Sequence, residues 1–160
     1  MNLNSSPRGS MAELEHQVPG AVAALRQLTL AVDATGLDKA LTELLKVRAS
    51  QINGCAFCLQ FHRNLARQNG VTQQRLDGLE QWAQAGDQYT PRERAALAWT
   101  EALTQMPAEA AQGGIPDAAY AALQGQFSAA EIAALTTSVA TINAWNRIAG
   151  ALAFAPPAAV

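Results

Sequence analysis

The segment of residues 43–62 constrains the fold of this chain most, because it contains both cysteines and one of the two histidines. Cys55 and Cys58 are three residues apart, and Cys58 and His62 are four apart. At 3.6 residues per turn, an α-helix places side chains with these spacings on one face. The sequence therefore predicts that two thiols and an imidazole share one helical surface.

Glu43 cannot join that face if the helix is continuous. Twelve residues at about 100° each place it about a third of a turn from Cys55 and about 18 Å along the axis. Asn53-Gly54 directly precedes the first cysteine, and both residue types favour turns over helix interiors. We therefore predict a helix–break–helix unit in which Glu43 faces the cysteines and the histidine across two packed helices.

The break is expected to place Cys55 in the first turn of the second helix. Unpaired backbone N–H groups and the positive end of the helix dipole favour a thiolate at that place. Cys-X-X-Cys pairs at helix N-termini can have cysteine pKa values well below the free value of about 8.5. From the residues alone, Cys55 is the thiol expected to have the lower pKa.

Three interpretations fit this group of side chains. In the first, a thiolate attacks a peroxide or a disulfide, and the second cysteine resolves the product as an intramolecular disulfide. In the second, Cys55, Cys58, His62 and Glu43 are zinc ligands, although structural zinc sites usually use a second Cys/His pair and this chain has no further cysteine. In the third, the cysteines are buried core residues without chemistry. We favour the redox interpretation.

The length and composition of the chain fit one domain. With 160 residues, 49% of them hydrophobic, the chain can bury a substantial core but is short for two domains. Apolar residues recur at helical spacing from Pro19 onwards, and no segment alternates as a strand would. We predict an all-α domain of six or seven helices over residues 11–160. The helices are expected at about 19–36, 38–53, 55–68, 72–86, 90–107, 116–124 and 128–150.

Residues 1–10 have no apolar run and are not a secretory signal. Pro7-Arg-Gly-Ser10 before Met11 looks like the remnant of a protease site from an expression tag. We expect residues 1–10 to be such a remnant or disordered, and Met11 to be the natural start.

Local signals mark several of the predicted helix ends. Thr90-Pro-Arg-Glu93 and Ser128-Ala-Ala-Glu131 are capping boxes, in which each end residue satisfies a backbone N–H of the other. Asn69-Gly70 is expected to close the cysteine helix, and Gly113-Gly114 to form a loop.

The last predicted helix carries almost no charge, since Arg147 is the only charged side chain after Glu131. Threonine, serine and asparagine side chains interrupt its apolar run, which argues against a membrane span. We therefore expect this helix to lie at the centre of the core or in a subunit interface.

Two further charged residues, one in the segment 43–62 and one outside it, have simple interpretations. Glu101 ends an apolar helical face and is interpreted as a surface carboxylate. Arg48 is either an exposed charge or a residue at the border of the site.

The charge of the chain restricts its partners. A net charge of −2 leaves no basic surface for nucleic acid or acidic lipid, so a small molecule or a protein thiol is the expected substrate. Two cysteines in Cys-X-X-Cys spacing fit a reducing compartment, which predicts a cytoplasmic protein.

At this point the residues resemble a known family. Glu43, eleven intervening residues, Cys-X-X-Cys, three residues and then His62 is similar to the signature of the alkylhydroperoxidase D (AhpD)-like proteins of the carboxymuconolactone decarboxylase superfamily. The segment Arg48-Ala-Ser-Gln-Ile-Asn-Gly-Cys-Ala-Phe-Cys58 is similar to stand-alone members of that family. Residues 92–104 and 142–147 also resemble it.

The resemblance implies roles for the four signature residues. Cys58 would be the thiol that attacks peroxide, and Cys55 would be the resolving thiol. Glu43 and His62 would form a proton relay, through water, that removes the proton of Cys58. Phe57 is a departure, because the best-known peroxidases of the family have a histidine directly before the second cysteine.

The function expected from the sequence is therefore a thiol-dependent peroxidase or disulfide oxidoreductase acting on small alkyl hydroperoxides. It would need no organic cofactor or metal, and a dithiol donor would reduce its oxidised cysteines again. The resemblance also implies a homo-oligomer, a trimer or a hexamer. The alternatives are a decarboxylase or lactone-handling enzyme like the superfamily's other branch, and a non-catalytic redox sensor or metal-binding module.

Overall fold

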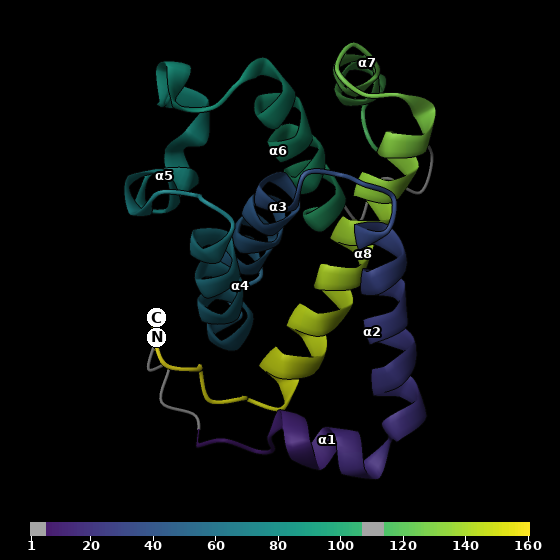
Figure 1. The fold of residues 1–160 in the computed structure, drawn as a ribbon, viewed down its shortest axis with the longest axis vertical. Coiled ribbons are helices and arrows are strands. Elements are labelled where there is room, and N and C mark those ends of the chain that lie inside the picture. The colour runs from purple at the N-terminus through teal and green to yellow at the C-terminus, as the bar shows by residue number, and fades with distance from the viewer. Residues whose placement is uncertain (1–5, 107–113) are drawn as a thin grey trace.

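The computed structural model of the chain describes residues 6–106 and 114–160, and every regular element within them is helical (Figure 1). The all-α fold class predicted from the sequence is thereby confirmed. The elements in chain order are α1 (Met11–Gln17), α2 (Pro19–Asp33), α3 (Lys39–Ile52), α4 (Ala56–Gln68), α5 (Gln73–Asp77), the 3₁₀ segments η1 (Leu79–Gln84) and η2 (Gly86–Gln88), α6 (Pro91–Thr104), α7 (Asp117–Gln124) and α8 (Ala129–Ala151).

Helix α3 lies at the centre of the fold and packs against α4, α6 and α8 (Figure 1). The chain reverses between α3 and α4 as predicted, because Asn53 is the C-cap of α3 and Gly54 adopts a φ of +64°. A positive φ of this kind is easily adopted by glycine and costs other residues energy. The two helices therefore form the hairpin expected from Asn53-Gly54.

Helix α1 was not predicted from the sequence. It has seven residues, buries none of them fully, and begins at Ser10, whose side chain accepts a hydrogen bond from the backbone N–H of Glu13. The backbone N–H of Arg8 donates to the carbonyl of Leu152, at 3.0 Å. Residues 8 and 10, which were placed outside the predicted fold, thus contact helical elements of the chain.

The single helix predicted for residues 72–86 is wrong. Helix α5 stops at Asp77, and the chain continues as two short 3₁₀ segments. The guanidinium of Arg94 donates to the carbonyls of Trp82 and Ala83, at 3.0 and 2.9 Å. These carbonyls would otherwise accept bonds from the next turn of an α-helix, so the tertiary bonds from α6 compete with helix continuation.

The two capping boxes are confirmed. Thr90 with Glu93 begins α6, and Ser128 with Glu131 begins α8, and both reciprocal side-chain bonds are present in each box. The predicted C-terminal end of the first of these helices, near Pro107, and the loop residue Gly113 lie outside the described residues.

Helix α8 is the uncharged helix of the sequence, and it crosses the fold beside α2, α3 and α6. The side chains expected to form its apolar seam are buried within the chain itself: Ile132, Leu135, Val139, Ile142, Asn146 and Ala149. Burial in the core therefore accounts for the absence of charge. No helix in the described residues is long and apolar enough to cross a membrane.

Glu101 is not the surface carboxylate that the sequence suggested. Its Oε1 accepts hydrogen bonds from Arg48 Nε and from Trp82 Nε1, both at 2.7 Å. The three residues connect α3, η1 and α6 in a partly buried cluster. Arg48 thus serves this cluster, away from the cysteines.

We expect Gly54→Ala to destabilise the protein by about 1–2 kcal/mol, because alanine at a φ of +64° adopts the left-handed conformation at a cost of that size. Gly20→Ala is the matched control, since Gly20 lies in α2 with no heavy atom within 4 Å of an added Cβ. The free energy of unfolding in urea measures both. Equal effects at the two positions would show that Gly54 is not required by the turn.

Candidate active site

Cys55 is the N-cap of α4 rather than a residue of its first turn, which corrects the predicted position by one residue. Its Sγ accepts a hydrogen bond from the backbone N–H of Cys58, at 3.3 Å. The sulfur thus occupies the place of the oxygen acceptor in an ordinary N-cap. Both cysteines are buried and neither is in a disulfide.

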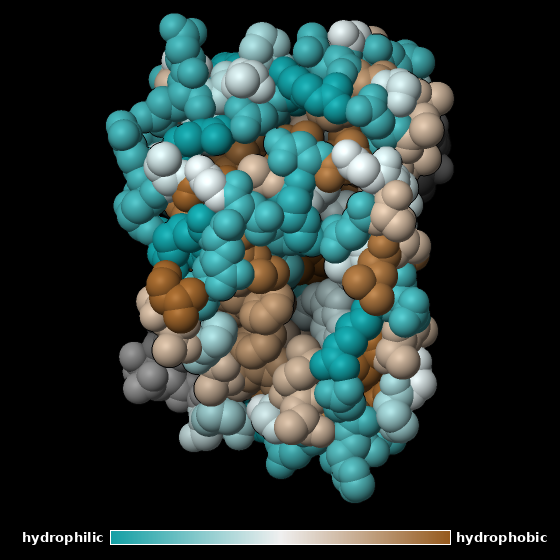
Figure 2. Space-filling model, viewed as in Figure 1, coloured by the Kyte–Doolittle hydropathy of each residue, from teal (hydrophilic) through white to brown (hydrophobic). Residues whose placement is uncertain are grey.

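A cavity of about 430 Å³ opens beside Cys58, between α2, α3, α4 and α8. Most of its walls are apolar side chains, among them Phe57, Phe61, Ile142 and Trp145. On the face shown in Figure 2, the surface is hollowed between α4 and α2, and hydrophobic atoms lie at this hollow. Cys58 and His62 are lining residues, whereas Cys55 is not. A molecule in the cavity would meet the second thiol first.

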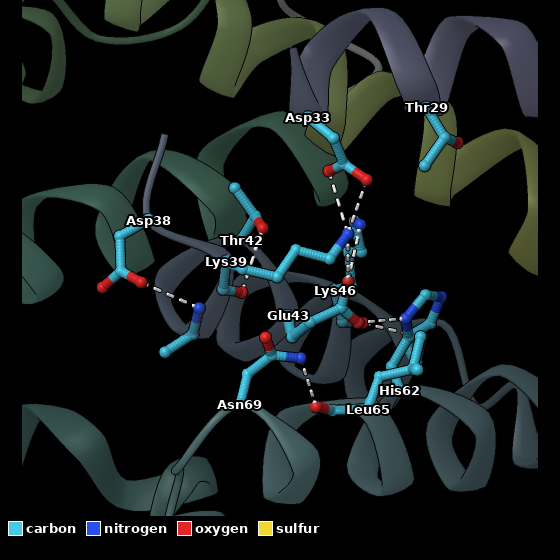
Figure 3. Close-up of polar contacts among 12 residues, drawn as sticks. Thr29, Asp33, Asp38, Lys39, Thr42, Glu43, Lys46, His62, Leu65 and Asn69 are labelled. Carbon is cyan, nitrogen blue, oxygen red and sulfur yellow. Dashed lines mark hydrogen bonds and ion pairs between the residues drawn. The ribbon is translucent and has the colours of Figure 1, made fainter. Parts of the chain in front are cut away.

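Glu43 and His62 meet across the α3–α4 hairpin as predicted. His62 Nδ1 lies 2.6 Å from Glu43 Oε2, and the carboxylate is fully buried (Figure 3). An ionised carboxylate can only accept hydrogen bonds, so Nδ1 must carry the hydrogen. The other ring nitrogen, Nε2, is then an acceptor in the neutral imidazole.

Two lysines that sequence reasoning missed complete the surroundings of Glu43. Its Oε1 lies 2.8 Å from Lys46 Nζ and 3.2 Å from Lys39 Nζ. Lys39 also pairs with Asp33, at the end of α2 (Figure 3). The signal was present in the sequence, because Lys39 and Lys46 stand four residues before and three residues after Glu43.

These contacts keep Glu43 ionised. Burial would raise the pKa of the carboxyl group, but the hydrogen bond from His62, the charge that His62 carries once it is protonated at low pH, and the ammonium of Lys46 outweigh it and lower the pKa to about 2. The pKa of His62 is lowered from its usual value, mainly by burial, while the bond to Glu43 works against that shift. Both results describe a carboxylate beside a neutral imidazole.

The two thiols differ in acidity. The pKa of Cys55 is lowered to about 7, because the Cys58 thiol, the backbone N–H groups of Cys58 and Phe57, and the Asn146 amide stabilise its anion against the effect of burial. The pKa of Cys58 is raised, first by the neighbouring Cys55 sulfur and second by burial. Of the two thiols, Cys55 is therefore the one that ionises first. This agrees with the lower pKa expected for Cys55 from its place at the helix N-terminus.

Asn146 on α8 is a third residue that sequence reasoning did not assign to the site. Its Nδ2 donates to Ser50 Oγ at 3.0 Å, and its Oδ1 accepts from Asn53 Nδ2 at 2.8 Å. Ser50 Oγ in turn donates to the carbonyl of Lys46, at 2.7 Å, so the orientation of the amide is fixed. The remaining N–H of Asn146 is available to the cysteine sulfurs.

Phe57, the residue between the cysteines that departs from the family pattern, lies at the wall of the cavity. Its ring is parallel to that of Phe61, with centroids 6.1 Å apart, and meets the Phe154 ring edge-on at 5.5 Å. Phe57 therefore stands where the family pattern has a histidine, and its ring makes an apolar contact between α4 and the C-terminal segment.

In residues 6–106 and 114–160, no group of three or more histidine, cysteine, aspartate or glutamate side chains is placed to hold a metal ion. The two carboxylate oxygens of Glu43 instead contact His62 and the two lysines. This arrangement suits proton transfer better than metal coordination.

Known proteins are similar to this chain in sequence and in fold. Residues 17–102 match the carboxymuconolactone decarboxylase family. The uncharacterised protein YdfG of Bacillus subtilis (strain 168) is 36% identical over 118 residues, which are 74% of this chain and 77% of that protein. The resemblance noted in the sequence is thereby confirmed.

Two solved structures have the same fold. One is a protein of unknown function from Agrobacterium tumefaciens, described as a candidate antioxidant defence protein AhpD. It is 35% identical, with a TM-score of 0.83 over 96% of this chain and 99% of that one. The other is the debrominase Bmp8, which is 22% identical, with a TM-score of 0.77 over 89% of this chain and 74% of that one. At this lower identity, the likeness concerns the fold alone.

Because the pKa of His62 is lowered in the folded protein, we expect the free energy of unfolding to decrease as the pH decreases. The unfolded chain takes up a proton near pH 6.5 that the folded chain binds only at lower pH, so the free energy of unfolding decreases by up to about 1.4 kcal/mol per pH unit below 6.5. Denaturant unfolding between pH 7 and 5 measures this slope.

His62→Gln should remove that part of the slope, because glutamine does not titrate in this range. His16→Gln is the matched control, since His16 is the other histidine and is exposed on α1. A slope that persists in His62→Gln, or one of opposite sign in the unmodified protein, would contradict a buried neutral His62.

Proposed function

Because the chain belongs to the carboxymuconolactone decarboxylase family, we propose that it is a thiol-dependent peroxidase and disulfide oxidoreductase that reduces small alkyl hydroperoxides. One observation carries the proposal. Cys58 and His62 line the same largely apolar cavity, and Glu43 is hydrogen-bonded to Nδ1 of the imidazole. Cys55 is the N-cap of α4, three residues before Cys58. The arrangement offers an attacking thiol, a base and a resolving thiol.

In the proposed first step, His62 removes the proton of Cys58. The imidazole can do this through Nε2, because Nδ1 donates to Glu43, and the Glu43 carboxylate stabilises the imidazolium that forms. The step is required because Cys55 is the thiol that ionises first, while the thiol that lines the cavity is Cys58. The low pKa of Cys55 and the attacking role of Cys58 are thus compatible.

In the proposed cycle, the two cysteines supply the two electrons that reduce the hydroperoxide, and one external dithiol supplies the two electrons that reduce the cysteines again. The Cys58 thiolate attacks the terminal oxygen of the hydroperoxide, the O–O bond breaks, and the alkoxide takes the proton from His62 to leave as an alcohol. The thiolate of Cys55 then attacks the Cys58 sulfenic acid, and the disulfide forms as hydroxide leaves and takes up a proton from the solvent to become water. A dithiol donor returns both cysteines to the reduced state and becomes a disulfide itself.

Several parts of the proposal come from the family resemblance and the composition rather than from the geometry. We propose a homo-oligomer, a trimer or a hexamer, in the cytoplasm. The electron donor would be a protein or small-molecule dithiol. Neither an organic cofactor nor a metal enters the proposed steps.

The first prediction is that Cys55 and Cys58 form a reversible disulfide, since cysteines at one helix start can bring their Cα atoms within the range of about 4.4–6.8 Å that a bridge requires. Mass spectrometry after addition of an organic hydroperoxide should show the loss of two hydrogens. Cys55→Ser should instead accumulate a sulfenic acid on Cys58, whereas Cys58→Ser should leave Cys55 reduced. Two free thiols after oxidation of the unmodified protein would contradict the redox proposal.

The second prediction concerns the proton relay. We expect Glu43→Gln and His62→Gln each to slow the oxidation of Cys58 by hydroperoxide by about 10²–10⁴-fold, which is the usual contribution of a general base. Both variants should raise the pKa of Cys58, while Cys55 at the helix N-terminus stays reactive towards an alkylating probe. Stopped-flow oxidation and the pH dependence of alkylation at each cysteine measure these effects.

Glu101→Gln is the control for the relay, because Glu101 is another ion-paired carboxylate, partly buried, that does not line the cavity. Its oxidation rate should match that of the unmodified protein. Loss of reactivity at Cys55 with Cys58 unchanged would reverse the roles of the two cysteines. Unchanged rates at both would show that Glu43 and His62 are structural.

A further inference from the structure

We propose that the cavity beside Cys58 contains a polar subsite, formed by Ser138 and Lys46, that binds an acceptor oxygen on the substrate. The inference rests on the proposed function and deepens it, because it names the substrate class. The substrate would be an apolar hydroperoxide that carries a second oxygen function away from its O–O bond.

Ser138 differs from the other hydroxyl residues in the middle of α8. Thr136, Thr137 and Thr141 each donate to the carbonyl four residues earlier, at 2.7–2.8 Å. Ser138 is only 3% exposed, lines the cavity, and its Oγ has no hydrogen-bond partner in the part of the chain that the structure describes. A buried hydroxyl without a partner costs free energy, so a ligand oxygen at this place would satisfy it.

Lys46 adds donors to the same cavity. The residue is only 6% exposed and lines the cavity from α3. Its ammonium group has three N–H donors, and the bond to Glu43 Oε1 is its only hydrogen bond within residues 6–106 and 114–160. Donors therefore remain for an oxygen in the cavity.

The charges near Lys46 balance without a ligand. Lys46 and Lys39 contact Glu43, and Lys39 also contacts Asp33, so two positive and two negative groups meet. The subsite is thus rich in donors but has no excess of charge. Hydrogen bonding to an oxygen, neutral or anionic, is the chemistry that it offers.

The helix rise gives the separation along α8 between Ser138 and the apolar cluster that contains Cys58. Ile142 belongs to the apolar cluster that contains Cys58, and Ser138 lies four residues earlier, which is about 6 Å along the helix. Apolar side chains form most of the cavity wall. A benzene ring with the reacting group and the second oxygen in para positions has this length.

The binding test uses redox-inert alcohols, so it does not depend on peroxidase activity. The probes are 2-phenyl-2-propanol and its 4-hydroxymethyl and 4-carboxylate derivatives, titrated into the reduced protein by calorimetry. We expect at least one of the derivatives to bind about 3- to 10-fold more tightly than the parent alcohol, as a hydrogen bond allows. A larger gain with the carboxylate would identify an anionic oxygen, and a larger gain with hydroxymethyl a neutral one.

Ser138→Ala should reduce this preference to less than about 2-fold. Thr137→Ala is the matched control, because its hydroxyl lies on the same helix, bonds to its own backbone and does not line the cavity. It should keep the full preference. Equal affinities for all three probes in the unmodified protein, or a preference unchanged in Ser138→Ala, would overturn the subsite.

The corresponding three hydroperoxides separate the subsite from the proposed function. The same order of preference should appear in the rate constants for oxidation of Cys58. Discrimination among the alcohols without cysteine oxidation would reject the peroxidase and retain the subsite. Oxidation by all three hydroperoxides at equal rates would reject the subsite and retain the peroxidase.

Discussion

The buried carboxylate of Glu43 is the interaction on which the rest of the site depends. An isolated charge in a protein interior is costly, so it must be paired and hydrogen-bonded. Glu43 meets this requirement with His62 on one oxygen and two lysines on the other. The same bonds tie α3 to α4 and, through Lys39 and Asp33, to the end of α2. One charge thus fixes both the packing of three helices and the tautomer of the imidazole.

The thiol with the lower pKa is not the thiol that lines the cavity. The N-cap position gives Cys55 the lower pKa, but its sulfur lies outside the cavity that a small molecule could enter. Cys58 is the thiol in the cavity, and its pKa is raised, first by the neighbouring Cys55 sulfur and second by burial. This division explains why reasoning from the helix dipole and reasoning from family resemblance favoured different cysteines. The proposed role of His62, which lines the same cavity, as the base for Cys58 would reconcile the two assignments.

The sequence was sufficient for the helical hairpin, because Asn53-Gly54 and the spacing from Glu43 to His62 are local signals. The same was true of the two capping boxes. It was not sufficient for the segment 72–88, where hydrogen bonds from Arg94 on α6 to the carbonyls of Trp82 and Ala83 compete with continuation of the helix. Asn146 and the partners of Glu101 were missed for the same reason, since their roles depend on which helices meet. Lys39 and Lys46 could have been found from their spacing to Glu43.

The Cys55 cap also has a consequence for the redox balance of the pair. In the reduced protein, a sulfur with partial thiolate character accepts the backbone N–H at the start of α4. A sulfur within a disulfide carries no such charge and is a weaker acceptor. If the pair forms the proposed disulfide, this bond would stabilise the dithiol form more than the disulfide and shift the reduction potential towards a more oxidising couple. A disulfide formed here would pass its oxidising equivalents readily to a donor, and the start of one helix would set that tendency.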